Sequence, residues 1–180
     1  MFNNIGVELY KKPKNFLIFI MINTIYDNDS NDRVGTLIFS PDRSKILIGL
    51  APNHKDDFNQ WDLVGKGHIQ YGDMKEETVN NEVYEESGLD VKSLQKEFLG
   101  STKYQKGQIY FYAVVLDSMP EKIECKSCFD WYGKQLPEFF KFKWVELKEA
   151  EKWLYKGLVK AIFSTEIYEK LNKAIENGII

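Results

Sequence analysis

The feature that most constrains this chain is an acidic stretch, G-D-M-K-E-E-T-V-N-N-E-V-Y-E-E-S-G-L, at residues 72–89. Asp73 and Glu76 have the spacing of a capping box, and Gly88 is a typical residue just past a helix C-terminus. The stretch therefore predicts a helix from about 74 to 87, in a segment that carries six carboxylates.

Three of these carboxylates share one side of the predicted helix. At about 100° per residue, Glu85 and Glu86 fall at about −60° and +40° from Glu82. Like charges at this spacing repel by a few tenths of a kcal/mol per pair, and the C-terminal half of a helix disfavours anions. Mg²⁺ or Mn²⁺ would offset that repulsion, because both ions bind carboxylate oxygens, water and phosphate. A solvated acidic surface is the alternative, and the carboxylates alone favour it.

The segment before the helix changes that balance. W-D-L-V-G-K-G-H-I-Q-Y-G-D, residues 61–73, predicts a short strand that leads into a glycine-rich loop. Gly65, Gly67 and Gly72 permit positive φ and close backbone approach, which suits a loop that helps to hold a metal or a phosphate. Together with the capped helix, this loop favours a metal site.

These residues resemble the Nudix box, G-x5-E-x7-R-E-U-x-E-E-x-G-U, in which U is an apolar residue. Asp73 stands where the box has its first Glu, and Asn81 stands where it has Arg. The flanking hairpin and the strand that ends in W-V-E-L-K-E-A also resemble the family, so the similarity extends from about residue 33 to 156. The residues that match the box at its spacing are Gly67, Glu82, Val83, Glu85, Glu86, Gly88 and Leu89.

The resemblance implies an α/β (α+β) Nudix-type fold, with a mixed β-sheet between helices. It also implies hydrolysis of a pyrophosphate bond in a nucleoside diphosphate linked to another moiety, with ADP-ribose or a dinucleotide as the first expectation. Glu82, Glu85 and Glu86, with the Gly67 carbonyl, would hold Mg²⁺ or Mn²⁺, which would polarise a phosphoryl oxygen and activate water. The candidate catalytic residues are Glu85, Glu82 and, outside the box, Glu138.

The departures from the box define an alternative. In the family the box Arg pairs with a box carboxylate and orients it, whereas Asn81 brings no positive charge. A catalytically weak Nudix-fold protein that binds nucleotides or regulates is therefore the second interpretation. The hydrolase is favoured because all three presumed metal ligands are present.

Substrate-binding candidates lie near the box and in a long mixed segment at 118–137. Lys66 could contact a phosphate, and Phe129, Trp131 or Tyr132 could stack on a base. An ordinary surface lysine and aromatic packing within the loop are the alternatives. The loops that set specificity carry no recognisable motif, so the sequence names no substrate.

The whole chain predicts a single Nudix domain at 1–180, with an N-terminal extension at 1–14 and a C-terminal helix at 164–177. The segment 118–137 is expected to be an excursion from the sheet. The other predicted elements are strands at 15–26, 34–40, 46–50, 94–102, 108–117 and 139–145, and a helix at 147–155.

Composition limits the partners and the location. A net charge of −3 argues against binding of long nucleic acid. The apolar run at 16–22 lacks a cleavage site and is too short to span a membrane, so we expect a cytoplasmic protein without membrane contact. Cys125 and Cys128 make only half a zinc site and are expected to be reduced thiols. I-G-V-E-L-Y, within residues 1–14, is a candidate pairing strand for a homodimer.

Overall fold

The computed structural model describes residues 31–52, 60–163 and 166–180. The strand expected at 15–26 and the candidate pairing segment lie outside these residues. In the described part of the chain, no helix is long and apolar enough to cross a membrane.

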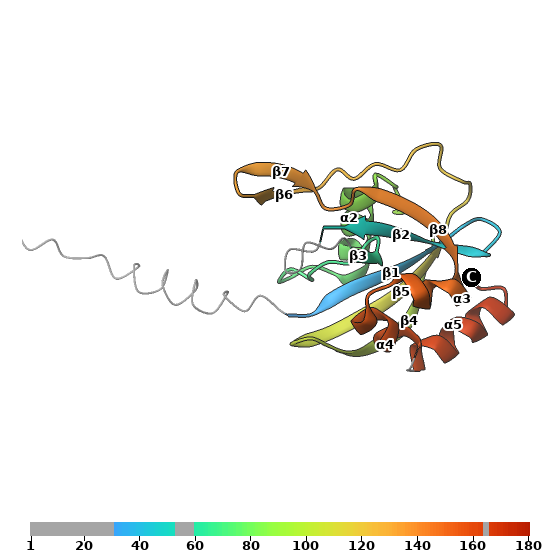
Figure 1. The fold of residues 1–180 in the computed structure, drawn as a ribbon. Helices are drawn as coiled ribbons and strands as arrows, with labels where there is room; N and C mark the ends of the chain where they lie inside the picture. Colours follow the sequence, from blue (N-terminus) through green and yellow to red (C-terminus); the bar gives the residue numbers. More distant parts are fainter. Residues whose placement is uncertain (1–30, 53–59, 164–165) are drawn as a thin grey trace, which may run out of the picture.

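A six-stranded mixed sheet forms the centre of the molecule (Figure 1). Its order is β3-β2-β1-β5-β4, and β8 also pairs with β2. Only β1 and β5 are parallel; the other paired strands are antiparallel. The predicted mixed sheet is therefore confirmed. The strands of this sheet are β1 (Arg33–Phe39), β2 (Lys45–Ala51), β3 (Gln60–Leu63), β4 (Lys96–Tyr104), β5 (Gly107–Val115) and β8 (Lys141–Glu146).

Helices cover both faces of the sheet. Strand β1 shows why: Ile38 packs in a buried cluster with Val79 and Val83 of α2, whereas Leu37 belongs to the cluster on the opposite face. This alternation is the period of two that a strand covered on both faces requires. The described helices are α2 (Lys75–Ser87) on one face and α3 (Leu147–Trp153), α4 (Lys156–Phe163) and α5 (Glu166–Glu176) on the other.

A two-stranded hairpin and one helix were absent from the sequence prediction. The segment at 118–137 contains a hairpin of β6 (Cys128–Trp131) and β7 (Lys134–Pro137), which turns through Tyr132 and Gly133 at φ of 50° and 78°. Such turns favour Asn-Gly, and Tyr in the first position hides the signal. Helix α4 was missed because Gly157 lies in its first turn, where an added Cβ would meet the Tyr155 ring.

The acidic helix is confirmed, but its predicted start is wrong by one residue. Met74 is the N-cap, and its N–H donates to Glu77 Oε2 at 3.4 Å. Asp73 instead belongs to the preceding turn, where its N–H donates to the Gln70 carbonyl at 3.1 Å. At the other end, Gly88 adopts φ of 74° and stops the helix as predicted.

Candidate active site

The glycine-rich loop is fastened along β1. The Val34 N–H donates to the Gly67 carbonyl at 3.0 Å, and the Thr36 hydroxyl donates to the Gly65 carbonyl at 2.8 Å. Gly65 has φ of 80°, and an added Cβ would lie 2.4 Å from Val83 of α2. The loop is therefore held between β1 and the acidic helix, where only a glycine fits.

Glu86 joins the helix to this loop. Its Oε2 accepts hydrogen bonds from the Gly65 N–H at 2.5 Å and the Lys66 N–H at 3.2 Å. The side chain is buried, with 5% of its surface exposed. Burial, followed by the charge of Glu82, raises the pKa of Glu86 well above its usual range, although the two N–H groups act in the opposite direction. A buried carboxylate whose charged form is disfavoured in this way is a candidate for cation binding.

Glu82 lies against the same loop. An added Cβ on Gly67 would overlap the carboxyl group of Glu82, so a side chain at this position would displace that carboxylate from the loop. Burial, then the charges of Glu85 and Glu138, raise the pKa of Glu82 to about 7. The positive charges of Arg33 and Lys66 partly counteract that rise.

Glu85 is placed differently from the other two box carboxylates. Its side chain is exposed. Its backbone carbonyl accepts hydrogen bonds from the N–H groups of Lys126 and Ser127, both at 2.8 Å. The structure therefore ties Glu85 through its backbone to the segment that leads into the β6–β7 hairpin.

A cavity of about 430 Å³ opens beside Glu86. It brings together four of the predicted site residues: Lys66, Glu86, Phe129 and Glu138. The remaining lining residues are Arg33, Ala51, Pro52, Asp62 and Phe139. The cavity is thus lined by charged groups of both signs and by two phenylalanines.

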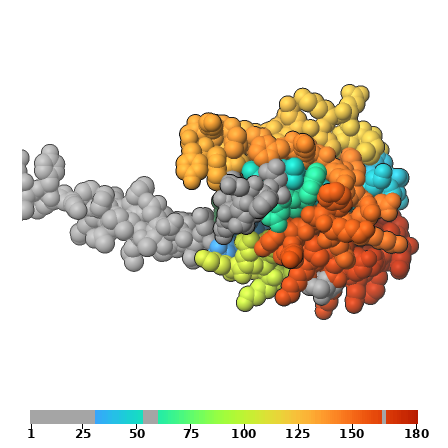
Figure 2. All heavy atoms as spheres, in the orientation of Figure 1, coloured from blue at the N-terminus to red at the C-terminus, as the bar shows by residue number. Residues whose placement is uncertain are grey.

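Three predicted site residues do not lie where the sequence placed them. They are Glu138, Trp131 and Tyr132. The predicted strand at 139–145 would place Glu138 directly before it, but β8 begins only at Lys141 and Glu138 follows β7 instead. Trp131 and Tyr132 do not line the cavity. Tyr132 is 90% exposed at the tip of the hairpin, which stands out from the body of the molecule in Figure 2.

Lys66 forms an ion pair with Asp62, the partner that the sequence prediction missed. Burial alone would lower the pKa of the Lys66 ammonium, but the charges of Asp62, Tyr104 and Glu86 outweigh burial and the net shift is upward. The sequence signal for this ion pair was the spacing of four positions between Asp62 and Lys66 in W-D-L-V-G-K-G. Arg33, also missed, stands at the start of β1 with no sequence signal of its own.

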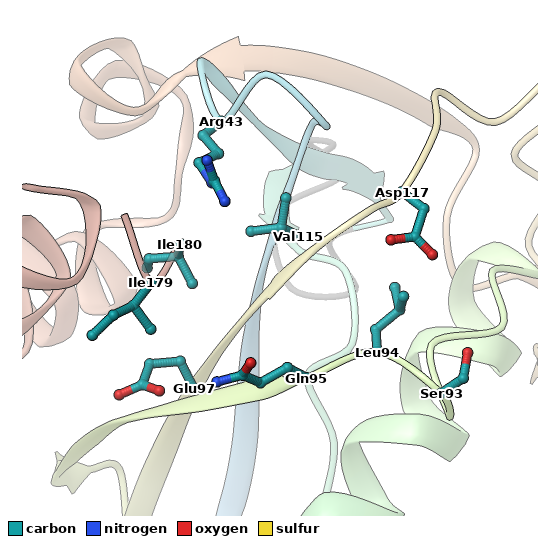
Figure 3. Close-up of a pocket in the computed structure, with 9 residues that line it drawn as sticks. All are labelled: Arg43, Ser93, Leu94, Gln95, Glu97, Val115, Asp117, Ile179 and Ile180. Carbon is teal, nitrogen blue, oxygen red and sulfur yellow. The ribbon is translucent and has the colours of Figure 1, made fainter. Parts of the chain in front are cut away.

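A second cavity, of about 410 Å³, lies at the other end of β1 and β5. Figure 3 shows Arg43, Val115, Asp117 and Ile180 among the residues around it. It contains none of the box residues. The candidate active site is therefore at the Gly67 end of the sheet.

The residues at this end fit a divalent cation chemically. Glu82 and Glu86 are close enough for their charges to interact, and the lack of a side chain at Gly67 lets the Glu82 carboxylate lie against the loop. Across the described residues, no three His, Cys, Asp or Glu side chains are grouped closely enough to hold a metal ion. The full ligand set of Glu82, Glu85, Glu86 and the Gly67 carbonyl stays a prediction. Cys125 and Cys128 are free thiols.

A protein-family model described as NUDIX domain matches residues 29–163 of this chain. The chain belongs to the Nudix family. This confirms the family that the box predicted, and with it membership among the Nudix pyrophosphohydrolases. Among curated protein sequences, none matches significantly.

Solved structures of Nudix proteins share the fold. The Caenorhabditis elegans Ap4A hydrolase is 18% identical, with a TM-score of 0.55, over 81% of this chain and 98% of that one. The Nudix domain of Shewanella oneidensis NrtR, in complex with ADP ribose, is 16% identical, with a TM-score of 0.57, over 87% and 97%. The Escherichia coli dihydroneopterin triphosphate pyrophosphohydrolase is 16% identical, with a TM-score of 0.56, over 76% and 95%. At these identities the similarity shows the fold alone.

Proposed function

We propose that this protein is a Mg²⁺- or Mn²⁺-dependent hydrolase that cleaves a pyrophosphate bond in a nucleoside diphosphate linked to another moiety. The observation that carries the proposal is the convergence of Glu82 and Glu86 on the Gly65–Gly67 loop at the wall of a mixed-charge cavity. Two neighbouring carboxylates with raised pKa values, one of which (Glu86) lines a cavity, are typical of a functional site rather than of a solvated helix surface.

The proposed ligands are Glu82, Glu85 and Glu86, with the Gly67 carbonyl. The Gly67 carbonyl already accepts the Val34 N–H, and its second lone pair leaves room for a further partner. When bound, the cation supplies polarisation of a phosphoryl oxygen and a bound water of lowered pKa.

The remaining steps belong to the chain itself. Glu138 lines the cavity and is the proposed general base that takes a proton from the attacking water, with Glu85 as the second candidate. Arg33 and Lys66 place positive charge where a polyphosphate would lie. Phe129 and Phe139 provide an apolar wall for a base or another flat group, which favours nucleotide substrates.

ADP-ribose and dinucleotide substrates are the first choice. One Nudix protein with this fold was solved in complex with ADP ribose, and another is an Ap4A hydrolase. ADP ribose joins adenosine to a second ribose through a diphosphate, and Ap4A joins two adenosines through four phosphates, so both contain the phosphoanhydride bond that the proposed reaction cleaves. The net charge of −3 argues against long nucleic acid as the substrate.

The test is a hydrolysis screen with Mg²⁺ or Mn²⁺ against ADP-ribose, dinucleoside polyphosphates, NADH, nucleotide sugars and nucleoside triphosphates. We expect turnover by the wild type, and a fall of more than about 100-fold in Glu86→Gln. Substitution of residues that only support metal ligands already lowers activity or metal affinity by about 10–100-fold. Glu76→Gln, an exposed Glu on the same helix, is the matched control and should retain activity. Absence of turnover with every substrate would contradict the proposal.

The alternative is a catalytically weak protein that binds nucleotides or regulates. The exposed Asn81 supports it, because the box Arg that would orient a carboxylate is missing. Tight binding of a nucleotide by calorimetry, with no turnover in the same screen, would favour this alternative over the hydrolase.

A further inference from the structure

Asp62 and Lys66 form a half-buried ion pair in the wall of the candidate active site. Their side chains expose 19% and 14% of their surface. Both oxygens of Asp62 are engaged: Oδ1 accepts the Leu63 N–H at 2.7 Å, and Oδ2 accepts the Lys66 ammonium. A carboxylate fixed on both sides holds its partner in one place.

The ammonium is close to the box carboxylates without pairing with them. The Lys66 backbone N–H contacts Glu86 Oε2 at 3.2 Å, so the flexible side chain starts next to this carboxylate. Among the described residues, however, Asp62 is the only carboxylate in an ion pair with Lys66. The positive charge of Lys66 still acts on Glu82 and Glu86 from where it lies.

An ammonium that moved onto Glu82 or Glu86 would compete with a divalent cation for the same oxygens. Such a move is favourable when Asp62 is lost, because a buried charge without its partner costs several kcal/mol. The side chain of Asn81 offers no charge that would prevent it. The position of the Lys66 ammonium therefore decides whether Glu82 and Glu86 are available to bind a divalent cation.

We propose that Asp62 is a positioning residue that holds the Lys66 ammonium away from Glu82 and Glu86 and so keeps these carboxylates available to the divalent cation. This inference rests on the proposed function, because it requires that Glu82 and Glu86 bind a cation. It assigns Asp62, which lies outside the box, a role that acts only through Lys66.

The experiment is a calorimetric titration of the full-length protein with Mn²⁺ alone, without nucleotide. The variants are Asp62→Asn, Lys66→Met and the double variant, with Asp117→Asn at the other end of the sheet as the control for loss of one carboxylate. We expect Asp62→Asn to weaken Mn²⁺ binding by about tenfold or more, the range found for residues that support metal ligands. The double variant should return to within about threefold of the wild type, since the competing ammonium is gone.

The outcomes separate this inference from the proposed function. Equal Mn²⁺ affinity in Asp62→Asn and the wild type would overturn the role of Asp62 and leave the metal site standing. Weaker binding in the double variant than in Asp62→Asn would also overturn it, because Asp62 would then act through the fold. A wild type that binds no Mn²⁺ would overturn both proposals.

Folding is checked by circular dichroism and thermal melting in EDTA. If Asp62→Asn does not fold, Lys66→Met alone decides the question. Our proposal expects Lys66→Met to bind Mn²⁺ as tightly as the wild type or more tightly, because it removes a competing charge. Weaker binding in Lys66→Met would overturn the proposal.

Discussion

At the scale of single residues, the candidate site contains carboxylates in electrostatically unfavourable surroundings. Burial and neighbouring carboxylates disfavour the charged forms of Glu82 and Glu86. Two backbone N–H groups donate to Glu86 and only partly offset the cost of its buried charge. Residues that lower stability where they serve function are expected at an active site.

This leads to a prediction about pH for the protein without a divalent cation. The pKa of Glu82 rises from 4.5 to about 7, chiefly through burial, so the folded state holds a proton that the unfolded chain has released. The free energy of unfolding should therefore decrease as pH rises from about 4.5 through 7, by on the order of 1–3 kcal/mol from this group. Urea unfolding in EDTA across this range measures the slope.

The variant Glu82→Gln isolates the contribution of this carboxylate. It should flatten the slope and stabilise the protein at pH 8, because the amide carries no charge at any pH, while hydrolysis is lost. Glu76→Gln, on the same helix but exposed, should leave the slope unchanged. A slope that is identical in Glu82→Gln and the wild type would show that Glu82 is not held in these surroundings.

At the scale of elements, the C-terminal end of α2 is where the helix meets the long excursion. The N–H of Glu124 donates to the Ser87 carbonyl at 2.9 Å, and those of Lys126 and Ser127 donate to the Glu85 carbonyl. These bonds satisfy carbonyls that a helix end leaves without partners. They also fix the path of the chain into β6.

Gly88 is the residue that makes this junction possible. It has φ of 74°, and an added Cβ would lie 3.2 Å from the Glu124 carbonyl oxygen and 3.0 Å from the Lys126 side chain. We expect Gly88→Ala to cost about 1–2 kcal/mol in the free energy of unfolding, from the left-handed backbone alone. Chemical denaturation measures it, and limited proteolysis should show faster cleavage between 118 and 127. Gly88→Asn, which tolerates this conformation, should cost less.

The same helix shows what the sequence could predict and what it could not. Its extent and its stop at Gly88 followed from local rules that act within a few residues. Its start did not, because the competing turn that engages the Asp73 N–H depends on Gln70 in the loop before it. The contact that fastens the buried Glu86 to the backbone of Gly65 and Lys66 also comes from a segment distant in the sequence, which helical spacing does not reveal.

At the scale of the molecule, two of the cavities among the described residues lie at opposite ends of β1 and β5, and the one at the Gly67 end is lined by the box residue Glu86. The box motif points to that end because it specifies the loop and the helix together. It could not predict Phe139 or Arg33 in the cavity wall, since these come from the start of β1 and the approach to β8, which meet only after folding. The family's common fold positions the carboxylates, and segments outside the box complete the cavity.

The last prediction concerns the excursion as a part of the whole. Phe129 of β6 lines the cavity although the hairpin is not part of the main sheet. If this ring contacts the base, Phe129→Ala should raise the KM for a nucleotide substrate by about 5- to 150-fold, from the 1–3 kcal/mol of a stacked base, with a smaller change in kcat. Phe98→Ala, a partly exposed ring on β4 outside that cavity, is the control and should leave KM unchanged. An unchanged KM in Phe129→Ala would mean that the hairpin packs beside the cavity without contributing to substrate binding.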